Sequence, residues 1–420
     1  MIPALARPRW IEDAGGVLAL ALGAVVAPYF VLRGWLNAGG TLLGLVAVWR
    51  VTAAGGWRAL GAHRPLALAV AALCAPLALT ALAQALHGEF APRHLDPPLR
   101  VALGGALLVY LHQRRVDWLR AAGVAVPLSL LLCAALLLAP GAARFHWGDR
   151  VASYFMDPLM LAQHAALVGF LSLFLVRADD TAALRALKLA GWLAGLGIAL
   201  ATGSRTGWLM LPLLALLWLA STGRLRRPLH LALALGALAL AALALYALSP
   251  VVRTRVDLVA TEIPAYLAGA NPDTSIGIRL SLFQVAWAAF LEHPWAGWGF
   301  TTLPTPEALP ATAALWTDLM RATFIHSGTH NEWLQHMMRM GVLGLLARAA
   351  LYLVPLALFA RAALAGEGPA RTAGYLGLVV VGGYLTASFT SEVSNLVYLS
   401  TFYGTMVAAF GAIALQPRQP

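Results

Sequence analysis

The chain has few charged residues and almost no cysteine for its length. Of its 420 residues, 11% are charged and only two are cysteines. Soluble domains carry about 25% charged residues, so this composition excludes an ordinary soluble protein. Cys74 and Cys133 both fall within apolar runs. This placement argues against a disulfide framework and against a cysteine metal site.

Two further features are missing from the sequence. It has no evident internal repeat of the kind that many transporters show, which disfavours a transporter. It also has no Asp-x-Asp motif and no histidine–carboxylate cluster in the segments expected to face outward. We therefore expect no metal and no other cofactor.

Long apolar runs dominate what is present, since 60% of the residues are hydrophobic. A helix needs roughly 20 apolar residues to cross a bilayer, and helices satisfy their own backbone hydrogen bonds there. The runs at 34–49 and 98–112 are short, so the count is eleven or twelve. The sequence thus predicts an all-α, polytopic membrane protein with about twelve transmembrane helices, at 14–32, 34–49, 65–86, 98–112, 118–139, 154–176, 183–201, 206–222, 229–248, 332–360, 372–389 and 394–415.

The net charge of +11 is distributed unevenly between the connections. With a cytoplasmic N-terminus, basic clusters at 50–64, 114–120, 177–188, 224–227 and 361–371 fall on alternate connections. The other short connections hold one or two positive charges each. This bias is typical of cytoplasmic loops. It places both termini inside and requires no nucleic-acid partner.

The same topology divides the chain into three parts. Residues 1–248 would form transmembrane helices 1–9, and residues 332–420 would form helices 10–12. Between them, residues 249–331 would form one large outer loop. The candidate functional residues gather in and around this loop.

Arg205 lies in a short outward turn, Gly203–Gly207, between two apolar runs. Ser204 suits an N-cap, which would place Arg205 in the first turn of the next helix. A helix N-terminus favours anions, and a guanidinium adds a bidentate donor for phosphate. The alternative is an arginine that only reaches towards the lipid headgroups.

Within the loop, Asn271–Ser275 is turn and cap chemistry that leads into a helix at 275–291. Ile276, Leu280, Phe283 and Trp287 recur near helical spacing, which predicts an amphipathic helix on the membrane or over a cavity. Arg279 would lie in its first turn. Its alternative role is that of an ordinary residue on the polar face.

His330 ends the loop, and a helix is expected to begin directly after it. Leu334, Met337 and Gly341 follow at helical spacing, which places His330 at the top of a membrane helix near the lipid plane. A neutral imidazole accepts a hydroxyl proton near neutral pH. A structural hydrogen-bonding role is the alternative.

Other ionisable groups are secondary candidates. Arg321 and His326 precede His330, and Glu332 follows it as a group that either orients the imidazole or caps the helix. Arg348 and His164 lie within predicted spans, where ionisable groups are costly and suggest function or a polar seam between helices.

Three motifs together resemble the O-antigen ligase and O-antigen polymerase superfamily. They are Thr202–Trp208, the stretch from Arg279 through the His293–Gly299 turn, and His330-Asn331 followed after nine residues by Gly341. The resemblance covers about 200–350 in detail, and the twelve-span topology with one late outer loop agrees with it. The spacing to Gly341 favours a ligase over a polymerase.

The resemblance implies a GT-C-like, inverting and metal-independent glycosyltransferase in the inner membrane of a Gram-negative bacterium. Such a ligase transfers O-antigen glycan from undecaprenyl diphosphate to lipid A–core at the periplasmic face, among the membrane lipids. Arg205 and Arg279 would bind the donor diphosphate, and His330 would activate the acceptor hydroxyl. A polymerase or a protein-glycosylating ligase of the same superfamily is the first alternative, and a lipid-linked glycan transporter or an inert scaffold the second.

Overall fold

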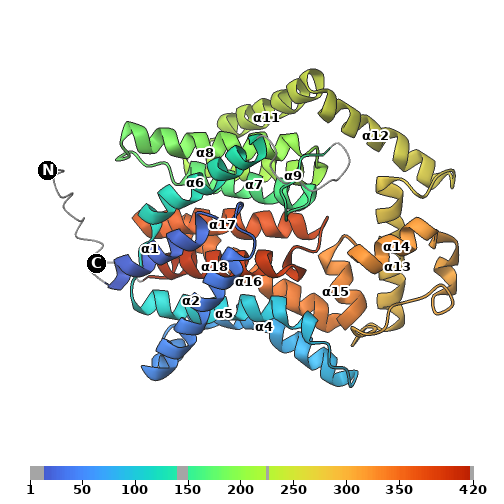
Figure 1. Cartoon of the computed structure of the whole chain (residues 1–420), viewed down its shortest axis with the longest axis horizontal. Helices are drawn as coiled ribbons and strands as arrows, with labels where there is room; N and C mark the ends of the chain where they lie inside the picture. Colours follow the sequence, from blue (N-terminus) through green and yellow to red (C-terminus); the bar gives the residue numbers. More distant parts are fainter. Residues whose placement is uncertain (1–13, 140–149, 224–226, 417–420) are drawn as a thin grey trace.

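A computed structural model of the chain describes residues 14–139, 150–223 and 227–416 (Figure 1). Within these ranges the protein is helical and has no strand, which confirms the all-α prediction. The longer helices in the first half are α1 (Ala14–Val26), α2 (Trp35–Ala53), α4 (Arg64–Leu86), α5 (Asp96–Gln113), α6 (Leu119–Leu138), α7 (Pro158–Phe174), α8 (Ala182–Ala201), α10 (Leu211–Ser221) and α11 (Pro228–Leu248).

The second half continues with helices of the segment predicted to form the outer loop and of the last predicted spans. These are α12 (Pro250–Leu267), α13 (Ser275–Glu292), α14 (Asp318–Ser327), α15 (Glu332–Met340), α16 (Val342–Ala365), α17 (Gly368–Ser388) and α18 (Val397–Ala414). Short helices fill several connections: α3 (Ala59–Ala62), α9 (Arg205–Leu209) and the 3-10 turns η2 (Gly56–Arg58), η3 (Pro92–His94), η5 (Pro310–Leu315) and η6 (Val393–Asn395).

Helix falls on every range predicted as a span, but not always as one long helix. In the described residues, seven helices are long and apolar enough to cross a membrane: α2, α4, α6, α8, α11, α16 and α18. The range 206–222 is split into α9 and α10, and 332–360 is split into α15 and α16. At the second break the composition does change, because α15 carries Glu332, Gln335, His336 and Arg339 whereas α16 is largely apolar.

A tightly packed bundle forms the centre of the molecule (Figure 1). α18 packs against α5 and α17, and α7 packs against α8 and α17. Both α7 and α18 are buried over almost their whole lengths. α7 spans only about 25 Å at 1.5 Å per residue, and neighbouring helices, rather than lipid, cover its sides.

Helices α11 to α14 lie along one edge of the molecule, away from this centre (Figure 1). α11 has no buried residue, which suits an apolar helix that lipid surrounds. It leads through Ser249 into α12, and α12 packs against α13. The segment 249–331 therefore carries its own helices, and α13 reaches back to α15.

The predicted helix at 275–291 is present as α13, but its predicted apolar face was wrong. Ile276, Leu280 and Phe283 are half-buried and Trp287 is exposed. The buried face carries Leu282, Val285, Ala286 and Ala289, which cluster with Met320, Phe324 and Met338. α13 has apolar residues on both faces, and packing against α14 and α15 selects the second one.

Candidate functional site

His330 lies in a tight turn directly before α15 and has a left-handed backbone, with φ 54°. The Thr329 hydroxyl donates to the Asn331 carbonyl at 2.8 Å, which closes the turn around the histidine. The Asn331 side chain then accepts the backbone N–H groups of Trp333 and Leu334 at 3.0 and 3.1 Å. An N-cap after a left-handed residue fixes where the imidazole leaves the backbone.

The helix after His330 is short, and Gly341 ends it. We expected Gly341 to share a face with His330 on one membrane helix, but it has φ 60° and separates α15 from α16. A Cβ at this position would lie 2.4 Å from the Pro294 carbonyl oxygen. Glycine is therefore needed for both the turn and the close approach.

The glycine-rich turn at 294–299 closes the same end of α15. The N–H groups of Trp298 and Gly299 donate to the carbonyls of Met338 and Arg339 at 2.9 and 3.0 Å. These carbonyls belong to the last turn of α15, and carbonyls in that position have no hydrogen-bond partner within the helix. The two motifs noted in the sequence thus hold opposite ends of one nine-residue helix.

Arg205 begins α9 and connects three separate segments. Its guanidinium donates to the Arg255 carbonyl on α12 at 3.1 Å and to the Ser275 hydroxyl at the start of α13 at 3.3 Å. Ser204 is the N-cap residue as predicted, but its hydroxyl pairs with Thr206 at 2.8 Å and makes no capping bond. Arg205 therefore lies beside the N-terminus of α13.

Arg279 lies one residue beyond the first turn of α13, so the prediction of a first-turn position was off by one residue. Burial lowers the pKa of its guanidinium, and the charges of Arg205 and Arg150 lower it further, while Glu262 acts in the opposite direction. Burial and the charges of Arg255 and Arg205 lower the pKa of Arg150 in the same way. Four arginines therefore share one electrostatic neighbourhood and stay protonated at neutral pH.

None of these four arginines belongs to an ion pair within the ranges that the structure describes. Like charges held together without paired acids are electrostatically costly, and binding of an anion relieves that cost. A group with several negative charges is the natural ligand for such a cluster.

His330 lies at the border of this cluster. Burial lowers its pKa to about 4, and the positive charge of Arg279 contributes to the shift. The imidazole is therefore neutral at physiological pH and able to accept a proton. Arg279 interacts electrostatically with both Arg205 and His330, so these three residues, which are widely separated in the sequence, belong to one neighbourhood.

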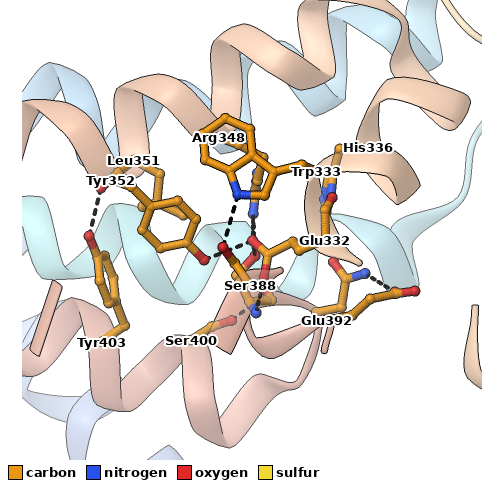
Figure 2. A network of polar contacts seen from close by, with 12 residues as sticks. Glu332, Trp333, His336, Arg348, Leu351, Tyr352, Ser388, Glu392, Ser400 and Tyr403 are labelled. Carbon is orange, nitrogen blue, oxygen red and sulfur yellow. Dashed lines mark hydrogen bonds and ion pairs between the residues drawn. The ribbon is translucent and has the colours of Figure 1, made fainter. Parts of the chain in front are cut away.

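Glu332 does not serve the imidazole, so the hypothesis that it orients His330 is wrong. Its carboxylate is fully buried and both oxygens are engaged (Figure 2). One oxygen accepts from Arg348 at 2.8 Å and from the Tyr352 hydroxyl at 2.9 Å, and the other accepts the Ser394 N–H at 2.9 Å. Glu332 thereby anchors the start of α15 to α16 and to the α17–α18 connection.

The other ionisable candidates have separate environments. Arg348 is the buried partner of Glu332, which explains its depth in the span. His164 bonds to the Tyr384 hydroxyl at 2.9 Å and to the Met160 carbonyl at 3.0 Å, a satisfied core position. Arg321 and His326 are exposed on α14, where the Arg321 guanidinium lies 5.8 Å from the Trp316 ring.

Glu392 is a group near the site that we did not predict. Its carboxylate accepts the Thr329 N–H at 3.0 Å, one residue before His330, and also the Asn395 side chain at 2.6 Å. Burial raises its pKa to about 7. Its only sequence signal is a short polar stretch, Ser391–Asn395, between two apolar runs.

In the described part of the chain, no group of three or more His, Cys, Asp and Glu side chains is placed to hold a metal ion. Metal independence stays a prediction for a chelation experiment.

Residues 189–349 match a family model described as O-antigen ligase. The matched segment begins in α8, ends in α16, and contains Arg205, Arg279 and His330. No curated protein matches the chain.

Proposed function

We propose that the chain belongs to the O-antigen ligase superfamily, whose family model matches residues 189–349, and that it is an O-antigen ligase. In this proposal it moves O-antigen glycan from undecaprenyl diphosphate to lipid A–core at the periplasmic face of the inner membrane. The observation that carries the proposal is the grouping of Arg205, Arg279 and the neutral His330 in one neighbourhood. The family match supports a membrane glycosyltransferase, and the site supports the chemistry.

The arginines suit the leaving group of this reaction. The donor's diphosphate carries two negative charges and departs when the bond to the anomeric carbon breaks. Fixed cations in a partly buried site stabilise the charge that develops on it, so no general acid is needed. A guanidinium also matches the oxygens of a diphosphate in a bidentate manner.

His330 suits the other half of the reaction. The acceptor hydroxyl is a poor nucleophile, and a neutral imidazole within reach takes its proton as the new bond forms. Inversion requires the hydroxyl to approach from the side opposite the diphosphate. Because Arg279 already borders the imidazole, the donor's anomeric carbon would lie between the arginine cluster and His330.

Paired histidine substitutions test this assignment. Purified protein in liposomes would receive undecaprenyl-diphosphate-linked glycan and lipid A–core. We expect His330→Ala to lose transfer by at least about a hundredfold, in line with the usual contribution of a general base. His326→Ala tests the second histidine, and we expect it to retain transfer because that side chain is exposed. Normal transfer by folded His330→Ala protein would exclude the proposed base.

A further inference from the structure

Glu262 on α12 is a buried acid within the arginine cluster. Only 8% of its surface is exposed, and its carboxylate accepts the Ile276 N–H at 3.0 Å. Ile276 lies in the first turn of α13, an 18-residue helix whose N-terminal N–H groups and dipole favour negative charge. A carboxylate therefore already occupies an anion-binding position at the start of this helix.

Arg205 is held next to the residues that surround Glu262. Arg205 donates to Ser275, the residue directly before Ile276, and to the carbonyl of Arg255. Arg255 precedes Glu262 on α12 by seven residues, which is two helical turns and so the same face. The negative charge of Glu262 offsets part of the mutual repulsion of the arginines.

Glu262 forms no ion pair with the arginines of the cluster. In the described ranges the four ion pairs involve other residues, so no guanidinium of the cluster lies within ion-pair distance of this carboxylate. Its effect acts through space and through the N-terminus of α13. Glu262 thus reduces the net charge of the cluster without occupying guanidinium N–H groups, of which Arg205 uses two for the Arg255 carbonyl and the Ser275 hydroxyl.

We propose that Glu262 is an internal counter-ion of the donor site, which competes with the donor's diphosphate and speeds release of the undecaprenyl diphosphate product. The proposal rests on the proposed function and adds an affinity-setting residue to it. When the donor is absent, Glu262 compensates part of the charge of the arginines. When the diphosphate is bound, the two anions repel each other, which weakens binding of both donor and product.

Two neutral substitutions on α12 test this role. Glu262→Gln keeps an oxygen that accepts the Ile276 N–H but removes the negative charge. Asp257→Asn removes a charge from an exposed position of the same helix, where Asp257 accepts the Tyr246 hydroxyl at 2.8 Å. The two variants have the same net charge, so a difference between them reports the position of Glu262.

We expect Glu262→Gln to lower the donor KM by about threefold to tenfold, with a smaller change at high salt. The kcat should fall, because product release slows. Asp257→Asn should match the native protein in both constants. An unchanged or raised donor KM in Glu262→Gln would overturn the proposal, the latter by showing that Glu262 positions the arginines.

Binding of inorganic pyrophosphate, followed by thermal shift, tests the same claim without turnover. Glu262→Gln should bind this probe about threefold to tenfold more tightly than the native protein and Asp257→Asn. If neither acceptor nor donor reacts with the native protein, the proposed ligase function fails while this measurement still decides the role of Glu262. Equal pyrophosphate affinity in all three proteins would exclude the proposed role of Glu262 as a counter-ion.

Discussion

At the residue scale, the site combines groups whose charges are set by their neighbours. His330 is neutral because burial and the charge of Arg279 lower its pKa. The arginines stay charged although they repel one another. The sequence pointed to Arg205 and His330 through their positions at the predicted outer surface, and to Arg279 through the family resemblance. Arg150, Arg255 and Glu262 were missed, since only the fold brings α9, α12 and α13 together.

The pH dependence of transfer should depend on the pKa of His330 and on the effect of Arg279 on that pKa. The histidine must be neutral to act as a base, so kcat/KM should fall on the acid side with a midpoint near the His330 pKa of about 4. Arg279→Gln removes a positive charge that disfavours the imidazolium. The His330 pKa then rises and the acid midpoint moves up, but it stays below the ordinary value of roughly 6.5 because burial, the larger cause of the shift, remains.

The control for this profile is Arg361→Gln, which removes a positive charge at an exposed position of α16. Its overall rate and acid midpoint should equal those of the native protein. An acid midpoint that stays near 4 in Arg279→Gln would show that this arginine does not set the charge state of His330.

At the scale of elements, α15 is a short helix that positions the histidine and is fixed by contacts at both of its ends. Asn331 caps its start, the 294–299 turn closes its end, and Glu332 ties it to α16 and to the α17–α18 connection. The prediction located this helix but joined it to α16 as one span over 332–360, although α15 is the more polar of the two helices. The break depends on the approach of Pro294, which no local pattern encodes.

Removal of the Glu332 carboxylate should destabilise the protein, because α15 loses this attachment. Glu332→Ala leaves the buried Arg348 without its acidic partner, a loss that costs about 3–5 kcal/mol of unfolding free energy. Replacement of both residues by apolar ones of similar volume, as in Glu332→Leu with Arg348→Met, should recover most of it. Thermal unfolding in detergent measures the stability of the single and the double variant. Equal melting temperatures for Glu332→Ala and the native protein would contradict the proposal that Glu332 anchors α15.

The break at Gly341 makes a second prediction. Gly341→Ala forces a Cβ against the Pro294 carbonyl at a left-handed position, so unfolding free energy should fall by more than about 1 kcal/mol. Gly236→Ala is the matched control, because a Cβ on that α11 glycine meets nothing within 4 Å. If the two variants unfold at the same temperature, the close approach of Pro294 to Gly341 is not tight.

At the scale of the whole molecule, apolar composition and charge bias predicted the helical content and the position of every apolar segment. The predicted count of about twelve spans stays a prediction: in the described residues seven helices are long and apolar enough to cross a membrane, and others such as α7 are shorter. The three-part division of the chain stays a prediction. The family match covers 189–349, the part in which α9, α13 and α15 gather the site.

Cysteine labelling tests the predicted sidedness. In a background with Cys74 and Cys133 replaced, Glu307→Cys should react with a membrane-impermeant maleimide from the periplasm, because residue 307 is exposed and its segment is predicted to face outward. Arg114→Cys, exposed on the connection predicted to be cytoplasmic, should react only after the inner membrane is opened. The reverse pattern would invert the topology and remove the site from the periplasm.

The measurement that most directly tests the central claim is the identity of the product made by the native protein. The reconstituted protein would receive the lipid-linked glycan and lipid A–core in the presence of a chelator, and the products would be identified by mass spectrometry. We predict glycan joined to lipid A–core, with undecaprenyl diphosphate released in equal amount. Longer lipid-linked glycans would make the protein a polymerase, and an unreacted donor under all acceptor conditions would contradict glycosyl transfer.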